Sequence, residues 1–111
     1  MPNIRRLNHA VLYVTDAQRS ATFYREVLGF ETVQESSDGR AVFLRAGGSD
    51  NHHDLGLFGV GAVPRSQGAG LYHLAWQVDT IDELVEIRGR LLEAGAPKGE
   101  SEHRASPTVY Q

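Results

Sequence analysis

An internal duplication constrains the fold of this chain more than any other feature of its sequence. A short apolar segment that carries a histidine occurs twice: His9 and Val14 of the first copy align, at one constant offset, with His73 and Val78 of the second. In each copy the segment leads into an amphipathic helix that ends at a glycine. Self-similarity at a fixed spacing indicates a repeated supersecondary unit. The sequence therefore predicts two related units.

The first copy predicts a strand, a helix and three further strands. The segment 7–14 is rich in β-branched and aromatic residues, and Thr15-Asp16 follows it as a helix-capping pair. Apolar residues spaced by three and four predict a helix over 17–28, with Gly29 as its C-cap. Turn-forming residues then separate three segments of strand character, at 30–35, 41–45 and 53–60.

The second copy begins with a predicted strand over 71–78. Thr80 and Glu83 have the spacing of a capping box, and the helix that follows is expected to close at Gly95. Its predicted buried stripe consists of Leu84, Ile87, Leu91 and Leu92. Only about two strands fit after this helix, at 99–103 and 106–111, so this copy is one strand shorter than the first.

These elements predict an α+β fold built from two βαβββ-type units that form curved mixed sheets around a cleft. The first unit covers 1–61, a linker covers 62–70, and the second unit covers 71–111, all within one domain. Because an unpaired sheet edge is avoided in native proteins, the missing last strand of the second unit is expected after Gln111.

Composition excludes several classes of function. With 41% hydrophobic and 23% charged residues the chain has the balance of a globular domain. It has no cysteine, which excludes disulfides and thiolate metal sites. A net charge of −3 argues against nucleic-acid or anionic membrane partners. No signal peptide or spanning segment is recognisable, so a cytoplasmic protein is expected.

Histidines are the candidate functional residues. His9 and His73 occupy equivalent positions in the two copies, which favours a shared divalent metal site over two unrelated strand histidines. In the pair His52-His53, alternation along a strand turns the two side chains to opposite faces, and His53 shares the face of Leu55 and Leu57. His53 is thus the candidate acid or base, and His52 the surface residue.

Taken together, these motifs resemble the vicinal oxygen chelate superfamily, which includes glyoxalases, extradiol dioxygenases, fosfomycin-resistance enzymes and bleomycin-binding proteins. Asn8-His9-Ala10-Val11 and Leu71-Tyr72-His73-Leu74 look like the two metal-histidine strands of the extradiol group. His52-His53-Asp54-Leu55 looks like its H-H-x-L segment, and His103 with Val109-Tyr110 is similar to its signature. In that group the signature continues into a strand that bears a glutamate ligand.

This resemblance implies His9 and His73 as ligands of a divalent metal, with a glutamate expected beyond Gln111 as the third. It implies Fe(II) first, with Mn(II), Ni(II) or Zn(II) as alternatives. Further implied roles belong to His53 as acid/base, to His103 and Tyr110 as hydrogen-bonding groups near the substrate, and to Phe43, Phe58 and Trp76 as cleft-lining residues.

The implied function is extradiol-type cleavage of a catechol-like small molecule with vicinal oxygens. Two alternatives stay open: a glyoxalase-like isomerase or lyase, and a metal-free binding protein of the bleomycin-resistance type. Gly56 stands where glyoxalases usually carry a glutamate, which argues against the glyoxalase reaction. A homodimer is expected, because an incomplete sheet leaves an edge for a neighbouring chain.

Overall fold

A computed structural model describes residues 1–63, 68–71 and 73–95, and the backbone of 99–102 and 107–110. The chain divides into two compact units, Met1–Pro64 and Arg65–Gln111, and the boundary falls inside the predicted linker 62–70. Each unit is described by itself below. Neither helix of the described residues has the length and apolar character required to cross a bilayer.

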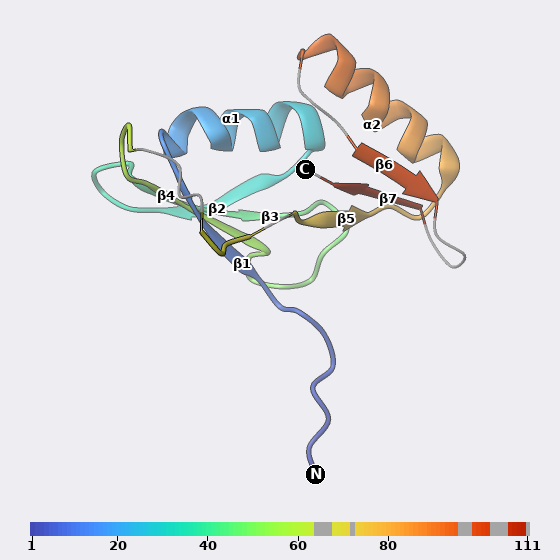
Figure 1. Ribbon diagram of the computed structural model, residues 1–111, viewed down its shortest axis with the longest axis horizontal. Coiled ribbons are helices and arrows are strands. Elements are labelled where there is room, and N and C mark those ends of the chain that lie inside the picture. The colour runs from blue at the N-terminus through green and yellow to red at the C-terminus, as the bar shows by residue number, and fades with distance from the viewer. Residues whose placement is uncertain (64–67, 72, 96–98, 103–106, 111) are drawn as a thin grey trace. The chain divides into compact units, whose positions relative to one another are not determined.

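The first unit contains one helix and a four-stranded mixed sheet (Figure 1). Strand β1 pairs in parallel with β4, and β4–β3 and β3–β2 pair antiparallel, giving the order β1-β4-β3-β2. The predicted order of one strand, one helix and three strands is confirmed. The elements are β1 (Ala10–Val14), α1 (Ala17–Leu28), β2 (Glu31–Glu35), β3 (Ala41–Arg45) and β4 (Leu55–Gly59).

Helix α1 begins and ends where its capping residues predict. The carboxylate of Asp16 accepts hydrogen bonds from the backbone N–H of Gln18, at 3.0 Å, and of Arg19, at 3.2 Å. These bonds satisfy donors that a helix N-terminus leaves unpaired. At the other end Gly29 has a φ of 75°, a left-handed conformation that favours glycine. Both helix ends were therefore set by local sequence.

The core of the first unit lies between α1 and one face of the sheet. Strands β3 and β4 supply its fully buried side chains, and α1 adds Ala17, Ala21 and Tyr24. A Cβ at Gly59 would lie 3.3 Å from the backbone nitrogen of Ala17, so odd-numbered residues of β4 face the helix. The four fully buried strand residues are Val42, Leu44, Leu55 and Leu57.

The opposite face of this sheet, here called the open face, carries Val11, Phe43 and Gly56. A Cβ at Gly56 would lie 3.3 Å both from the Phe43 ring and from Val11 Cγ2. Val11 is 50% exposed and Tyr13, on the same face of β1, is 79% exposed. Large apolar side chains on this face are thus accessible to a ligand.

The second unit contains β5 (Ala75–Gln77), α2 (Ile81–Glu93), β6 (Gly99–Glu102) and β7 (Pro107–Tyr110). Its three-stranded sheet has the order β5-β7-β6, and both pairings are antiparallel. In the first unit β4 lies between β1 and β3; among the described residues of the second unit no strand takes that place. Strand β5 pairs directly with β7. The sheet formed by β5, β7 and β6 is antiparallel, whereas a mixed sheet was predicted.

Helix α2 has the predicted capping box: Thr80 Oγ1 accepts from the Glu83 N–H, at 3.1 Å, and Glu83 accepts from the Thr80 N–H, at 3.2 Å. Leu84 and Leu91 are buried as predicted, whereas Leu92 is 58% exposed and its predicted burial is wrong. Successive helical residues are about 100° apart, so a stripe through Leu84 and Leu91 leaves Leu92 beside it.

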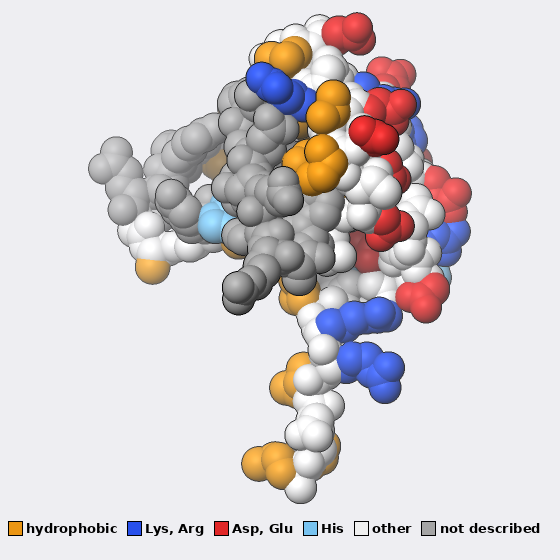
Figure 2. Space-filling model, turned by 90° about the vertical axis from the view of Figure 1, so that its right-hand side faces the viewer, with side chains coloured by type: hydrophobic (Ala, Val, Ile, Leu, Met, Phe, Trp, Pro, Cys, Tyr) orange, Lys and Arg blue, Asp and Glu red, His pale blue; other side chains and the backbone are white. Residues whose placement is uncertain are grey.

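Three predicted strands begin too early. β1 starts at Ala10 rather than residue 7, β4 at Leu55 rather than 53, and β5 at Ala75 rather than 71. The ladder between β1 and β4 starts where the Ala10 N–H donates to the Asp54 carbonyl, at 3.1 Å. Residues 1–9 precede that point and are all exposed, along the N-terminal segment visible in Figure 2. His9, His53 and His73 therefore lie just before strands.

Candidate functional site

His9 and His53 lie side by side at the open face of the first unit. Their ring centroids are 4.5 Å apart with the planes tilted by 50°. The edge of the Phe43 ring meets His53 at a centroid distance of 5.1 Å, and Phe58 meets Phe43 in the same manner at 5.9 Å. Two imidazoles that precede the parallel strands β1 and β4 thus lie together, and His53 also contacts the aromatic side chain of Phe43.

His52 is an exposed neighbour that engages one nitrogen of His53. The two Nδ1 atoms are 3.0 Å apart, a hydrogen-bond distance. One of these nitrogens must donate and the other accept, because neutral imidazole has one of each kind. The Nε2 atom of His53 is therefore the ring nitrogen available to a bound molecule.

The ring of His9 is oriented by the residue before it. His9 Nδ1 lies 2.8 Å from Oδ1 of Asn8. Asn51 contacts Asn8 twice: its Nδ2 donates to the Asn8 carbonyl at 3.0 Å, and its Oδ1 accepts from Asn8 Nδ2 at 3.4 Å. Asn51 Oδ1 also accepts from Arg6, at 2.8 Å. These contacts bring together residues more than forty positions apart in the chain.

Asp54 holds the loop that carries Asn51, His52 and His53. Its Oδ2 accepts from the Ala46 N–H, at 2.9 Å, and its Oδ1 accepts from Ser49 Oγ, at 2.9 Å, and Asn51 Nδ2, at 2.7 Å. The Asp54 N–H donates to the Leu44 carbonyl, at 2.8 Å. The Asp54 carboxylate, close to the start of β4, thus binds groups along the whole loop that connects β3 to β4.

Burial lowers the pKa of His53 from the ordinary histidine value of 6.5. The neighbouring imidazoles of His9 and His52 lower this pKa further, because a second positive charge close by is unfavourable, while Asp54 opposes them. His53 is therefore neutral at neutral pH, the form in which an imidazole acts as a base or a metal ligand.

We expect the stability of the first unit to fall in mild acid because of His53. The unfolded chain binds a proton at His53 more readily than the folded chain, so the free energy of unfolding decreases as pH drops below 6.5. His53→Gln should lose part of the difference in melting temperature between about pH 7.5 and about pH 5.5. An unchanged pH dependence in this variant would contradict the assignment to His53.

The structure corrects the argument that selected His53 from the sequence. Leu55 and Leu57 face α1, whereas His53 contacts Phe43 on the open face. Strand alternation does not apply to His53, because β4 starts only at Leu55. The structure also explains why glycine occupies position 56: the Phe43 ring and Val11 fill the space that a side chain would need.

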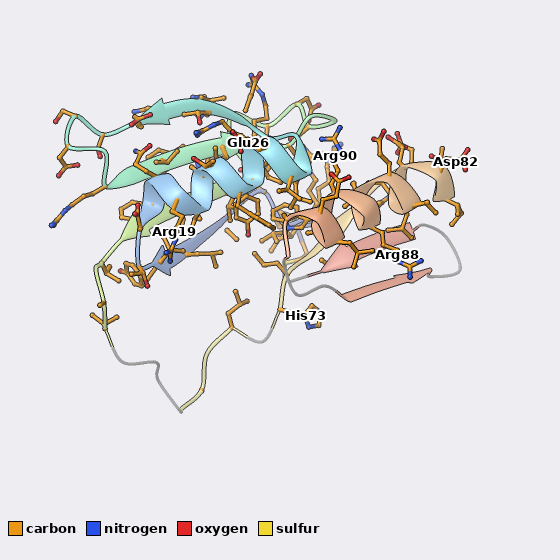
Figure 3. The ribbon with its side chains drawn as sticks, turned by 90° about the horizontal axis from the view of Figure 1, so that it is seen from above. Arg19, Glu26, His73, Asp82, Arg88 and Arg90 are labelled. Atoms are coloured by element: carbon orange, nitrogen blue, oxygen red, sulfur yellow. The ribbon has the colours of Figure 1, made fainter. Side chains whose placement is uncertain are left out.

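The remaining predicted site residues belong to the second unit. His73 is exposed on the segment before β5 (Figure 3), and its pairing with His9 stays a prediction. Trp76 is half-buried in β5. Tyr110 ends β7, where its backbone is in register with Ala75 and Gly99. His103 lies outside the described residues.

Sequence reasoning missed Asn8, Asn51 and Asp54 as parts of this site. Asn8 and Asp54 stand in the histidine motifs, but no role was assigned to them. Asn51 stands in a turn-rich segment, Gly47 to Asn51, where asparagine is common for local reasons. Its contacts with Asn8 are long-range, so no local signal could have found them.

A divalent metal fits the donors of the first unit in part. His9 is exposed, and its Nδ1 is engaged by an amide oxygen, which leaves Nε2 as the nitrogen with a lone pair; metal-binding histidines have this arrangement. Within the part of the chain that the structure describes, no three His, Asp or Glu side chains are grouped closely enough to hold a metal. A metal held at His9 would therefore need further ligands from outside the first-unit cluster.

Comparison with protein families decides what kind of domain this is. The family model for the Glyoxalase/Bleomycin resistance protein/Dioxygenase superfamily matches residues 6–106. The chain belongs to this superfamily. Its members include enzymes, and the fold of the superfamily accounts for the repeated strand and helix units seen here.

Curated relatives in the superfamily carry the names of different enzymes. Metapyrocatechase 2 of Cupriavidus necator is 32% identical over 95 residues, which cover 86% of this chain and 28% of that protein. An iron-dependent extradiol dioxygenase of Rhodococcus jostii is 33% identical, covering 70% of this chain and 28% of its own length. Human mitochondrial methylmalonyl-CoA epimerase is 31% identical over a region that covers 75% of this chain and 52% of that protein. The chain thus spans under a third of these dioxygenases.

Solved structures of the superfamily share this fold. The glyoxylase/bleomycin resistance protein/dioxygenase domain from Frankia sp. EAN1pec superposes with a TM-score of 0.68 at 22% identity, covering 92% of this chain and 84% of that one. The predicted α+β fold of this superfamily is confirmed.

Proposed function

We propose that this chain is a metal-dependent vicinal oxygen chelate enzyme that carries out extradiol-type ring cleavage of a catechol-like substrate. The observation that carries the proposal is the pairing of two imidazole rings with centroids 4.5 Å apart: His9, whose Nδ1 is engaged by Asn8, and His53, whose pKa is lowered. Two neighbouring imidazoles with different hydrogen-bond partners can serve as metal ligand and as proton acceptor, respectively.

The proposed metal ligands are His9 and His73, with Fe(II) preferred to Mn(II), Ni(II) or Zn(II). A metal held by these residues would supply Lewis-acid and redox chemistry for a substrate with two adjacent oxygens. The iron-dependent extradiol dioxygenase among the relatives supports Fe(II). His103 and Tyr110 are proposed to hydrogen-bond the substrate oxygens.

His53 Nε2 is proposed to accept the hydroxyl proton of the substrate. Its neutral state at neutral pH supports this role, which requires that His53 Nδ1 donate to Nδ1 of His52 and so leave the lone pair on Nε2. Phe43 lies against the His53 ring, and Phe58 packs on Phe43, so an aromatic substrate ring would meet aromatic side chains on the open face.

Metal binding provides the first test. We expect His9→Ala to weaken Fe(II) or Mn(II) binding, measured anaerobically by titration calorimetry, by at least about 100-fold, because even an outer-shell partner of a ligand is worth 10–100-fold. His52→Ala is the matched control, since His52 is exposed and has no proposed role at the metal. Equal affinity of wild type and His9→Ala would contradict the assignment of His9.

Activity provides the second test. The Fe(II)-loaded protein should convert members of a catechol panel to coloured ring-cleavage products, and His53→Gln should slow this conversion by about 100-fold or more, the usual contribution of a general base. A protein that binds metal but leaves every catechol intact would remove the ring-cleavage proposal.

An isomerase or epimerase reaction is the second candidate, and the methylmalonyl-CoA epimerase relative favours it. Here His53 would move a proton at a carbon next to a carbonyl group. Solvent deuterium incorporation into such a substrate, without consumption of oxygen, would distinguish this reaction. A glyoxalase proper is disfavoured, because Gly56 stands where glyoxalases usually carry a glutamate and a Cβ there would lie only 3.3 Å from the Phe43 and Val11 side chains.

A metal-free binding role is the remaining alternative. It requires that Fe(II) and Mn(II) fail to bind at His9, so the calorimetric titration decides it. The homodimer and the cytoplasmic location stay predictions from the sequence; light scattering coupled to size-exclusion chromatography would test the dimer.

A further inference from the structure

We propose that Asn51 is a positioning residue that selects the tautomer of His9 and so exposes the lone pair of His9 Nε2 to a cation. Treating the cation as the ligand rests on the proposed function; the selection of the tautomer itself does not. Asn51 touches neither the cation nor a substrate in this proposal, and it acts only through Asn8.

Two charged groups impose the orientation of the Asn51 amide, because one can only accept hydrogen bonds and the other can only donate them. Asp54 can only accept hydrogen bonds, and it lies 2.7 Å from Asn51 Nδ2. The Arg6 guanidinium can only donate, and it lies 2.8 Å from Asn51 Oδ1. Turning the amide over would set donor against donor and acceptor against acceptor, so one orientation is selected.

The fixed amide of Asn51 in turn orients Asn8. Asn51 Nδ2 donates to the Asn8 carbonyl, at 3.0 Å, and Asn51 Oδ1 lies 3.4 Å from Asn8 Nδ2. With its NH₂ group turned toward Asn51, Asn8 presents its Oδ1 to the imidazole, at 2.8 Å from His9 Nδ1. An amide oxygen can only accept, so His9 Nδ1 must carry the proton.

The consequence is that the neutral form of His9 has its lone pair on Nε2. Free histidine in water favours the other tautomer, with the proton on Nε2, so the network works against the intrinsic preference of the ring. The loop between β3 and β4 therefore determines which nitrogen of a residue on the β1 side can bind a cation. Metal-binding histidines depend on such a partner at the other nitrogen for tautomer and orientation.

The tautomer can be measured without metal or substrate. Imidazole ¹⁵N shifts of the full chain at one pH above about 8, where histidines are neutral, report which nitrogen is protonated. We expect wild-type His9 in the Nδ1–H form, Asn8→Ala shifted to the Nε2–H form, and Asn51→Ala a mixture of the two. Asp50→Ala is the matched control: Asp50 neighbours Asn51, and among the described residues its carboxylate contacts Arg6 alone, in an exposed pair at 3.4 Å, so His9 should stay in the Nδ1–H form.

Mn(II) affinity is the second readout. Asn51→Ala should bind Mn(II) about 10–100-fold more weakly than wild type, the range for outer-shell partners of metal ligands, and Asp50→Ala should bind as wild type does. Amide spectra that match wild type outside the 46–54 loop would show that the Asn51→Ala fold is retained.

The two readouts separate this inference from the proposed function. A pure Nδ1–H tautomer in Asn51→Ala overturns the role of Asn51, even if wild type binds Mn(II) and cleaves catechols. A tautomer shift in Asn51→Ala supports that role, even if wild type proves unable to bind Mn(II) and the proposed function fails.

Discussion

Leu57→Ala is expected to lower the free energy of unfolding of the first unit by about 2–5 kcal/mol, the cost of emptying a leucine site in a packed core. Leu57 is fully buried between β4 and α1, together with Leu44 and Leu55. The surrounding strands are tied into a four-stranded ladder, so they can close only part of the cavity.

Urea unfolding followed by far-ultraviolet circular dichroism measures this loss, and hydrogen exchange at the amides of β3 and β4 assigns it to the first unit. Leu7→Ala is the matched control, since Leu7 is 74% exposed ahead of β1 and should change stability by less than about 0.5 kcal/mol. Equal losses in the two variants would refute the core that the structure shows.

Asp54→Ala is the second substitution with a large expected effect, a loss of about 2–3 kcal/mol. Its carboxylate accepts bonds from the Ala46 N–H, Ser49 Oγ and Asn51 Nδ2, and removing it leaves these donors without that partner. The same substitution should release Asn51 and so disturb His9. Loss of stability and loss of metal affinity are thus expected together.

Chemical denaturation and Mn(II) titration of the same Asp54→Ala sample check both effects. Asp50→Ala again serves as control: the Asp50 side chain is 90% exposed, and its 3.4 Å ion pair with Arg6 is worth little. If Asp54→Ala were as stable as Asp50→Ala, the carboxylate would not organise this loop in solution.

The pKa of His53 and the tautomer of His9 depend on contacts between the segment before β1 and the loop between β3 and β4. The pKa of His53 is lowered because the ring is partly buried and lies beside His9 and His52, and His9 exposes one chosen nitrogen because Asn51 reaches Asn8. In a relative with a different β3–β4 loop we expect the pKa of the residue equivalent to His53 and the tautomer of the one equivalent to His9 to differ. The loop is therefore a place where members of one superfamily can diverge in chemistry.

Local sequence was sufficient for the helices and for the repeat. Asp16, Gly29 and the Thr80–Glu83 box mark helix ends correctly, because a cap satisfies backbone groups within three or four residues of itself. The apolar spacing gave the order of strands and helices in both units, because periods of two and 3.6 residues are properties of the chain alone.

Only the tertiary structure decided where strands begin and which way the loop residues face. β1 and β4 start together at the bond from the Ala10 N–H to the Asp54 carbonyl, and the position of His53 relative to the sheet follows from that start. The network of Arg6, Asn8, Asn51 and Asp54 joins segments more than forty residues apart. Such long-range hydrogen bonds depend on the tertiary fold, which neither the hydrophobic periodicity nor the local spacing of residues predicts.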